Sequence, residues 1–212
     1  KNGLRNEDGT GVLVGLTRIS DVVGYKKENG KKIDTEGELY YRGVKVSDFI
    51  KGHDAKNRFL FEEVCFLILF GYLPNKDELE AFKKELASRY ELPLNYLQAR
   101  ILGFPMQNMM NKLQQEVLML YTYDETPDDI SPEATLNKGL DLIAKIPEIV
   151  CYAYRCKVHY FDSDSLFIHP VNTEYSIAEN ILQMLRIDRS FTKTEASVLD
   201  MCLVLHADHG GG

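Results

Sequence analysis

A chain of 212 residues, with 44% hydrophobic and 27% charged residues, has the composition of a folded globular protein and enough length for one main core, which argues against wholesale disorder. Its net charge of -7 leaves no excess of basic residues to neutralise phosphates, so the composition argues against nucleic-acid binding. A small anionic substrate is not excluded, because one or two Arg or His side chains hold a carboxylate whatever the overall charge.

The start of the chain carries no sign of a targeting signal or a membrane anchor. Residues 1–6 contain no apolar run of the kind found in signal peptides. Elsewhere no stretch approaches the roughly 18 apolar residues that a membrane span needs. We therefore predict a cytoplasmic protein that has no membrane partner.

Residues 11–49 carry short apolar runs rich in Val, Ile and Tyr, and glycines separate these runs. Such spacing predicts short strands joined by turns. Asn29-Gly30 is a candidate for a tight reverse turn, because both residues tolerate positive φ. We therefore predict that residues 1–50 form an amino-terminal extension and a small β-hairpin region.

The apolar period becomes helical near residue 50, and residues 51–212 predict a mainly α-helical domain. No repeat, low-complexity tract or linker marks another boundary. The expected helices are residues 59–70, a helix capped by Asn75, and residues 109–121, 132–154 and 176–185, followed by a helix that begins near residue 192.

Local signals place several helix ends. Asn75 with Glu78, and Thr192 with Glu195, have the spacing of capping boxes, in which two side chains satisfy free backbone N–H groups. Pro147 lies inside one expected helix. Because proline has no N–H and clashes with the preceding turn, we expect that helix to kink or break there.

The four cysteines show no recognisable pairing pattern. Cys65, Cys151, Cys156 and Cys202 lie mostly in apolar runs, and their spacings match neither a Cys-x-x-Cys pair nor a secreted disulfide framework. We interpret all four as reduced core residues. A redox or metal pair of Cys151 and Cys156 is the alternative.

The last expected helix ends in a cluster of titratable side chains. Val198, Leu199, Cys202, Leu203 and Leu205 predict an apolar face, and the helix then reaches His206-Ala207-Asp208-His209-Gly210. The two histidines lie three residues apart, which places both on one face of a helix, and the glycine is a natural helix end. Imidazoles in this position suit carboxylate binding or carbonyl polarisation near neutral pH.

Two other interpretations of His206 and His209 stay open at this point. Both rings can pack at the helix end and bond backbone carbonyls. In the second interpretation the two histidines bind a metal ion. However, structural and catalytic zinc sites use at least three protein ligands, and the helical zinc signature spaces its histidines four apart. We therefore predict no metal site.

Four stretches of the chain, in the same order, resemble the citrate synthase family. They are Gly37–Gly43, Phe61–Pro74, Ala178–Leu182 and Leu203–Gly212, of which the last resembles the first active-site signature of the family. The opening Gly3–Val12 resembles a bacterial branch with an amino-terminal extension. The chain thus resembles the amino-terminal portion of a bacterial citrate or 2-methylcitrate synthase, truncated before the small domain.

The resemblance implies a partial, citrate synthase-like helical large domain from a homodimeric acyltransferase of the tricarboxylic acid cycle. Such an enzyme condenses acetyl-CoA with oxaloacetate to citrate and CoA, and it needs no cofactor because acetyl-CoA is a substrate. By position, His209 matches a histidine that helps to hold oxaloacetate, and His206 matches its supporting companion. The family's catalytic residues follow the position of Gly212, so we expect none within this chain.

The condensation needs a base, donors that stabilise an enolate and a group that activates the ketone. We therefore expect the 212-residue chain alone to be inactive and the full-length enzyme to be active. One alternative is a 2-methylcitrate synthase, whose propionyl-CoA substrate is larger by one methylene. Another is a non-catalytic helical module that dimerises through residues 108–121 and 132–154. Uncovered apolar surface also predicts self-association.

Overall fold

A computed structural model describes residues 6–7, 10–12, 17–56 and 58–208, with the backbone alone for residues 53–56. The described chain is mainly α-helical with one three-stranded antiparallel sheet, which confirms the expected fold class. It divides into two compact units, a first unit of residues 1–79 and 197–212 and a second unit of residues 80–196. Each unit is described by itself below.

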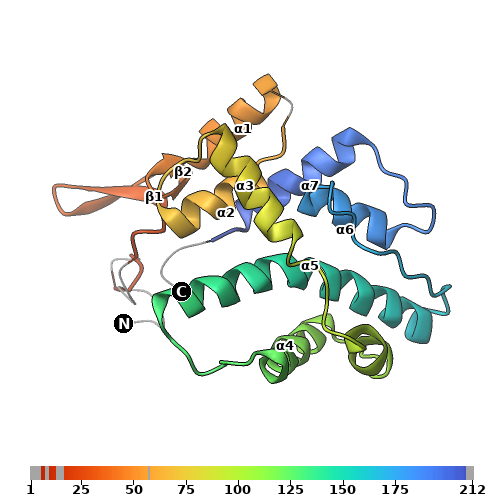
Figure 1. Cartoon of the computed structure of the whole chain (residues 1–212). Coiled ribbons are helices and arrows are strands. Elements are labelled where there is room, and N and C mark those ends of the chain that lie inside the picture. The colour runs from red at the N-terminus through yellow and green to blue at the C-terminus, as the bar shows by residue number, and fades with distance from the viewer. Residues whose placement is uncertain (1–5, 8–9, 13–16, 57, 209–212) are drawn as a thin grey trace. The chain divides into compact units, whose positions relative to one another are not determined.

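Figure 1 labels helices α1–α7 and strands β1 and β2. The described elements are β1 (Ser20–Glu28), β2 (Lys31–Tyr41), β3 (Val44–Lys45), α1 (Val46–Lys56), α2 (Phe61–Phe70), α3 (Lys76–Ala87), the π-helix η1 (Leu97–Leu102), α4 (Met109–Leu120), the 3-10 helix η2 (Tyr121–Tyr123), α5 (Pro132–Asp162), α6 (Ile177–Leu185) and α7 (Lys193–Leu205). None of these helices is long and apolar enough to cross a membrane.

The sheet of the first unit is built from two tight hairpins. Asn29-Gly30 joins β1 to β2, and Arg42-Gly43 joins β2 to β3. All four residues have positive φ, at 52°, 75°, 48° and 80° in chain order. Positive φ at both central residues defines the turn whose twist matches that of antiparallel strands. The expected reverse turn at Asn29-Gly30 is confirmed.

The expected run of strands ends earlier than the sequence indicated. Helix α1 begins at Val46, directly after β3, whereas we expected strand-like structure as far as Phe49. Val46 and Phe49 lie three residues apart and are both buried, so they share one helical face against the core of the first unit. In so short a segment a β-branched and an aromatic residue favour a strand locally, and the tertiary contact overrides that preference.

Helix α2 supplies most of the core of the first unit. Six consecutive residues, 62–67, are buried, and the helix ends at Gly71, whose φ of 84° lets its N–H donate to the Leu67 carbonyl at 2.8 Å. This left-handed cap satisfies a carbonyl at the helix end. The buried core residues around it are Tyr41, Val46, Phe49, Leu60, Val64, Leu67 and Val204.

Asp200 of α7 caps the start of α2, where the residue preceding the helix makes no side-chain cap of its own. The Asp200 carboxylate is fully buried and accepts hydrogen bonds from the backbone N–H of Leu60 at 2.7 Å and of Phe61 at 3.0 Å. The first N–H groups of a helix have no partner within it and carry a partial positive charge. The buried carboxylate and the helix start therefore satisfy each other.

This contact corrects the expected orientation of α7. Its buried residues are Ala196, Ser197, Asp200 and Val204, which recur at helical spacing. By contrast Val198 is 51% exposed and Leu205 is 46% exposed, although we expected both to lie on the buried face. Burial of the Asp200 carboxylate rotates the neighbouring apolar residues outward.

The same rotation corrects the interpretation of one cysteine. Cys65, Cys151 and Cys156 are buried and free, as expected for reduced core residues. Cys202 is free but exposed, because it lies two residues after Asp200 and therefore on the other side of α7. The apolar residues around it in the sequence gave no sign of this exposure.

The second unit is organised around α5, which contacts α4, α6 and η1. Figure 1 shows α5 as one long helix, and it runs for 31 residues with Pro147 inside it. Of the two expected outcomes, a kink or a break, the break is wrong, because the helix continues through Pro147. The proline removes one backbone hydrogen bond, but the buried residues that follow it, such as Ile149 and Tyr152, keep the next turns in the core.

The expected helix caps are present. Glu78 N–H donates to Asn75 Oδ1 at 3.0 Å, and Asn75 N–H donates to Glu78 Oε2 at 2.8 Å. Thr192 and Glu195 make the same reciprocal pair at 2.8 and 3.2 Å. These bonds join residues three apart, so the sequence alone determines them.

The buried cap provides a stability prediction. We expect Asp200→Asn to lower the free energy of unfolding by about 1–3 kcal/mol, because the amide keeps one acceptor and leaves a buried N–H without its charged partner. Urea unfolding followed by circular dichroism measures this change. Asp77→Asn, exposed in the first turn of α3, is the control and should stay within about 0.5 kcal/mol. Equal midpoints for the two variants would show that the cap contributes little.

Candidate functional site

The carboxyl end of α7 carries the side chains that the sequence singled out. His206 follows the last residue of the helix directly, and Asp208 lies two residues further on. His209, the other expected binding residue, lies outside the described residues. The site can therefore be built from His206, Asp208 and the elements of the first unit that hold them.

The imidazole of His206 is exposed, and one of its nitrogens is occupied by the helix itself. Its Nδ1 lies 2.7 Å from the carbonyl oxygen of Cys202, one turn earlier. Because a carbonyl only accepts, Nδ1 carries the hydrogen, and Nε2 is left as an acceptor in the neutral ring or a donor in the charged ring. This bond holds the ring at Nδ1, so Nε2 is the nitrogen that remains for another partner.

Tyr41 anchors the last turn of α7 to the sheet. Its hydroxyl donates to the carbonyl of Val204 at 2.8 Å and approaches that of Leu205 at 3.3 Å. Burial raises the pKa of Tyr41, although backbone hydrogen bonds near Asp208 oppose the rise. The phenol therefore keeps the proton that it donates. The carbonyls at the end of a helix have no partner within it, so this bond fixes the place where the helix stops.

The turn that follows Tyr41, between β2 and β3, is hydrogen-bonded to α2. The Arg42 guanidinium donates to the carbonyl of Ile68 from Nε at 3.1 Å and from a terminal nitrogen at 2.7 Å. On the neighbouring strand, Ser20 Oγ donates to Asp208 Oδ2 at 2.8 Å. The segment that follows α7 is therefore held by β1, while the turn between β2 and β3 is held by α2.

Sequence reasoning found His206 and Asp208 but missed Ser20 and Tyr41 as their supports. Tyr41 lies within the stretch Gly37–Gly43 that resembles a known family, and this resemblance was the one sequence signal that could have pointed to Tyr41. Nothing local to Ser20 indicated a contact with a residue 188 positions away. The structure brings these four residues to one end of α7.

The chemistry available from the described part of this site is limited. One exposed imidazole can hold or polarise one oxygen of a bound ligand, because its Nδ1 bond to the Cys202 carbonyl leaves Nε2 for that role. Removing a proton from carbon and stabilising the resulting enolate take further groups at matched positions. Within the described ranges, no cluster of three or more His, Cys, Asp or Glu side chains is arranged to hold a metal ion.

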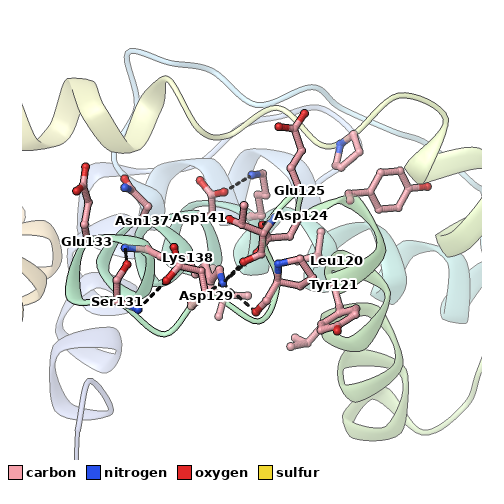
Figure 2. A pocket seen from close by; sticks show the side chains of 18 residues that line it. Leu120, Tyr121, Asp124, Glu125, Asp129, Ser131, Glu133, Asn137, Lys138 and Asp141 are labelled. Atoms are coloured by element: carbon pink, nitrogen blue, oxygen red, sulfur yellow. Dashed lines mark hydrogen bonds and ion pairs between the residues drawn. The ribbon is translucent and has the colours of Figure 1, made fainter.

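The second unit contains a groove of about 700 Å³, which Figure 2 shows with its lining side chains. Lys138 Nζ donates there to the carbonyls of Thr126, Pro127 and Asp129 at 2.6, 2.9 and 2.8 Å. It also lies 3.5 Å from the Asp124 carboxylate. The lysine is therefore committed to holding the loop before α5, which leaves it poorly suited to bind an anionic ligand.

Comparison with known proteins identifies relatives over most of the chain. The family model described as citrate synthase, C-terminal domain, matches residues 6–212. A citrate synthase of Haloferax volcanii is 33% identical over 206 residues, which cover 94% of this chain and 48% of that protein. A 2-methylcitrate synthase of Shewanella oneidensis is 30% identical over 172 residues, which cover 81% of this chain and 42% of that protein.

A solved structure has the same fold. The crystal structure of citrate synthase from Pyrobaculum aerophilum superposes with a TM-score of 0.73 at 27% identity, covering 94% of this chain and 46% of that chain. The chain thus spans about half the length of the relatives that it matches.

Proposed function

The chain belongs to the citrate synthase family, and from this premise we propose that it is the amino-terminal part of an enzyme that condenses acetyl-CoA with oxaloacetate. The products are citrate and CoA. The observation that carries the proposal is the family match over residues 6–212, which includes the signature at the end of α7. The proposed enzyme acts in the cytoplasm, within the tricarboxylic acid cycle, and uses no metal or bound cofactor.

Within this enzyme we propose that His209 and His206 bind oxaloacetate. The exposure of His206 and the fixed direction of its Nε2 support a role in holding a carboxylate or ketone oxygen. The anchoring of α7 by Tyr41 supports it further, because a binding group is effective only when its position is set in advance. In this proposal the base and the remaining donors come from chain that follows Gly212, so the 212-residue chain alone is inactive.

The acyl substrate that we propose is acetyl-CoA, with propionyl-CoA as the second candidate. A 2-methylcitrate synthase among the relatives favours this second candidate. The two thioesters differ by one methylene, which a hydrophobic pocket distinguishes by about 1–3 kcal/mol. Steady-state rates with both thioesters decide between them.

Activity of two polypeptides tests the proposed function. We expect the 212-residue chain to form no citrate from acetyl-CoA and oxaloacetate, and the polypeptide extended by the rest of its gene to form it. Citrate is measured by mass spectrometry, because the exposed Cys202 thiol would react with a thiol reagent. Citrate formed by the shorter chain would refute its inactivity. No product from the extended polypeptide with either thioester would refute the enzymatic proposal.

Substitution of the histidines tests their role. In the extended polypeptide we expect His209→Ala to raise the KM for oxaloacetate about ten- to a hundredfold, which is the effect of losing one hydrogen bond to a charged group. His206→Ala should raise it less, and the KM for the thioester should change little in both. His159→Ala is the control, because His159 is exposed in the last turn of α5. An unchanged KM in both variants would assign these rings a purely structural role.

We also propose that the protein is a homodimer that associates through α4 and α5. Met110 is 66% exposed and Leu118 is 74% exposed on α4, eight residues apart and so on one helical face. On α5, Val150 is 37% exposed and Tyr154 is 42% exposed, four residues apart. Apolar side chains gathered on helix faces in this way favour association, which also suits the alternative of a non-catalytic dimerisation module.

A single charge tests this association. We expect Leu118→Glu to convert a dimer into a monomer in sedimentation velocity at micromolar concentration, because association would bury an unpaired carboxylate. Ile187→Glu places the same charge at a site that is 68% exposed and lies outside both helices, and this variant should stay dimeric. A wild-type monomer, or a dimer that survives Leu118→Glu, would contradict this interface.

A further inference from the structure

The second unit contains a cavity of about 570 Å³, and none of the residues that line it belongs to α7. Its walls come from the segment 87–98, from α5 and from the segment 170–173. This volume falls within the range of about 300–1,000 Å³ that is typical of small-molecule sites. Apolar residues such as Leu97, Pro170 and Val171 form part of the wall.

Glu148 is the polar residue that distinguishes this cavity. Its side chain lines the cavity, the residue is only 8% exposed, and its Oε2 has no hydrogen-bond partner among the described residues. A buried carboxyl oxygen without a donor costs free energy, so native structures nearly always satisfy such an atom. A hydrogen-bond donor that enters the cavity would satisfy this oxygen.

The titratable groups in the cavity wall are two carboxyls and three phenols. The carboxyls are Glu148 on α5 and Glu91 on the segment opposite, and the phenols are Tyr90, Tyr96 and Tyr152. Burial raises the pKa of Glu148 to about 7, hydrogen bonding between its carboxyl group and the Tyr152 side chain opposes the rise, and the Glu91 carboxylate adds to it. Neither Lys nor Arg is present among the residues that line the cavity.

The hydroxyls of Tyr96 and Tyr152 do not supply the missing donor. Tyr96 donates to the carbonyl of Glu116 at 2.7 Å, and Tyr152 donates to the carbonyl of His169 at 3.0 Å. Each hydroxyl has one proton to donate, so both are committed to the backbone. Their rings remain as wall material, and aromatic faces attract cations.

We propose that this cavity binds a compact organic cation, a primary ammonium with a short apolar body, whose N–H donates to Glu148 Oε2. The ammonium supplies both the donor that the buried oxygen lacks and the positive charge that the two carboxyls lack. The apolar wall accommodates the carbon chain. An anion has no counter-charge in this wall, and a hard divalent cation takes six or more oxygen ligands, which two carboxyls and apolar residues do not provide. The inference does not depend on the proposed function.

Three ligands of equal length test this site on the complete protein. Isothermal titration calorimetry with n-butylammonium chloride, butan-1-ol and sodium butyrate, at constant ionic strength, should show saturable binding of the ammonium alone. Equal binding of the alcohol would reduce the site to an apolar cavity and overturn the proposal. Absence of saturable ammonium binding would overturn it as well.

The pH dependence of binding has a defined sign. The ammonium keeps its charge at neutral pH, whereas Glu148 must lose its proton to pair with it. Affinity should therefore be highest above the Glu148 pKa of about 7 and fall as the pH is lowered through it. Between about pH 8.5 and about pH 5.5 the expected loss is about thirtyfold, which follows from one linked proton. An affinity that is independent of pH would contradict the role of Glu148.

A matched pair of variants isolates the carboxylate. Glu148→Gln should abolish both the binding of butylammonium and its pH dependence. Glu133→Gln removes the same charge from an exposed position in the first turn of the same helix and should change neither. Unchanged binding in Glu148→Gln would overturn the proposal. The ligand and pH comparisons on the unmodified protein decide the question even where Glu148→Gln does not fold.

Discussion

The buried carboxylate of Asp200 determines how the candidate site is built. A buried carboxylate must be paired, and the backbone N–H groups at the start of α2 are among its partners. This pairing fixes the rotation of α7 about its axis within the first unit. Tyr41 then fixes the end of the helix. The direction in which His206 presents its free nitrogen follows from these two contacts.

The second unit also contains a buried carboxylate that is paired with an ammonium group, and Glu148 differs from it. Lys112 and Glu116 on α4 are each 1% exposed, and their charged atoms lie 2.6 Å apart. Lys112 also donates to the carbonyl of Arg100 at 3.0 Å. The charges of such a pair are neutralised within the protein. Glu148 has a neighbouring carboxylate where Glu116 has an ammonium, and the cavity beside it leaves room for one.

The candidate site could be predicted from the sequence only in part. A short signature at the end of the chain identified His206, because its neighbours in the sequence are also its neighbours in the family motif. Ser20 and Tyr41 escaped prediction as supports, since their partners lie 188 and 163 residues away. Glu148 escaped it too. A glutamate after a proline in an amphipathic helix gives no local sign that it will be buried.

The sequence by itself determined those features whose interactions span four residues or fewer. The turn at Asn29-Gly30 and the caps at Asn75 and Thr192 are of this kind, because the two ends of each bond lie in the same short segment. Only the tertiary structure decided that the helix continues through Pro147 and which face of α7 is buried. Both outcomes depend on burial against segments distant in the sequence, and that free energy exceeds the local preference which the residue types express.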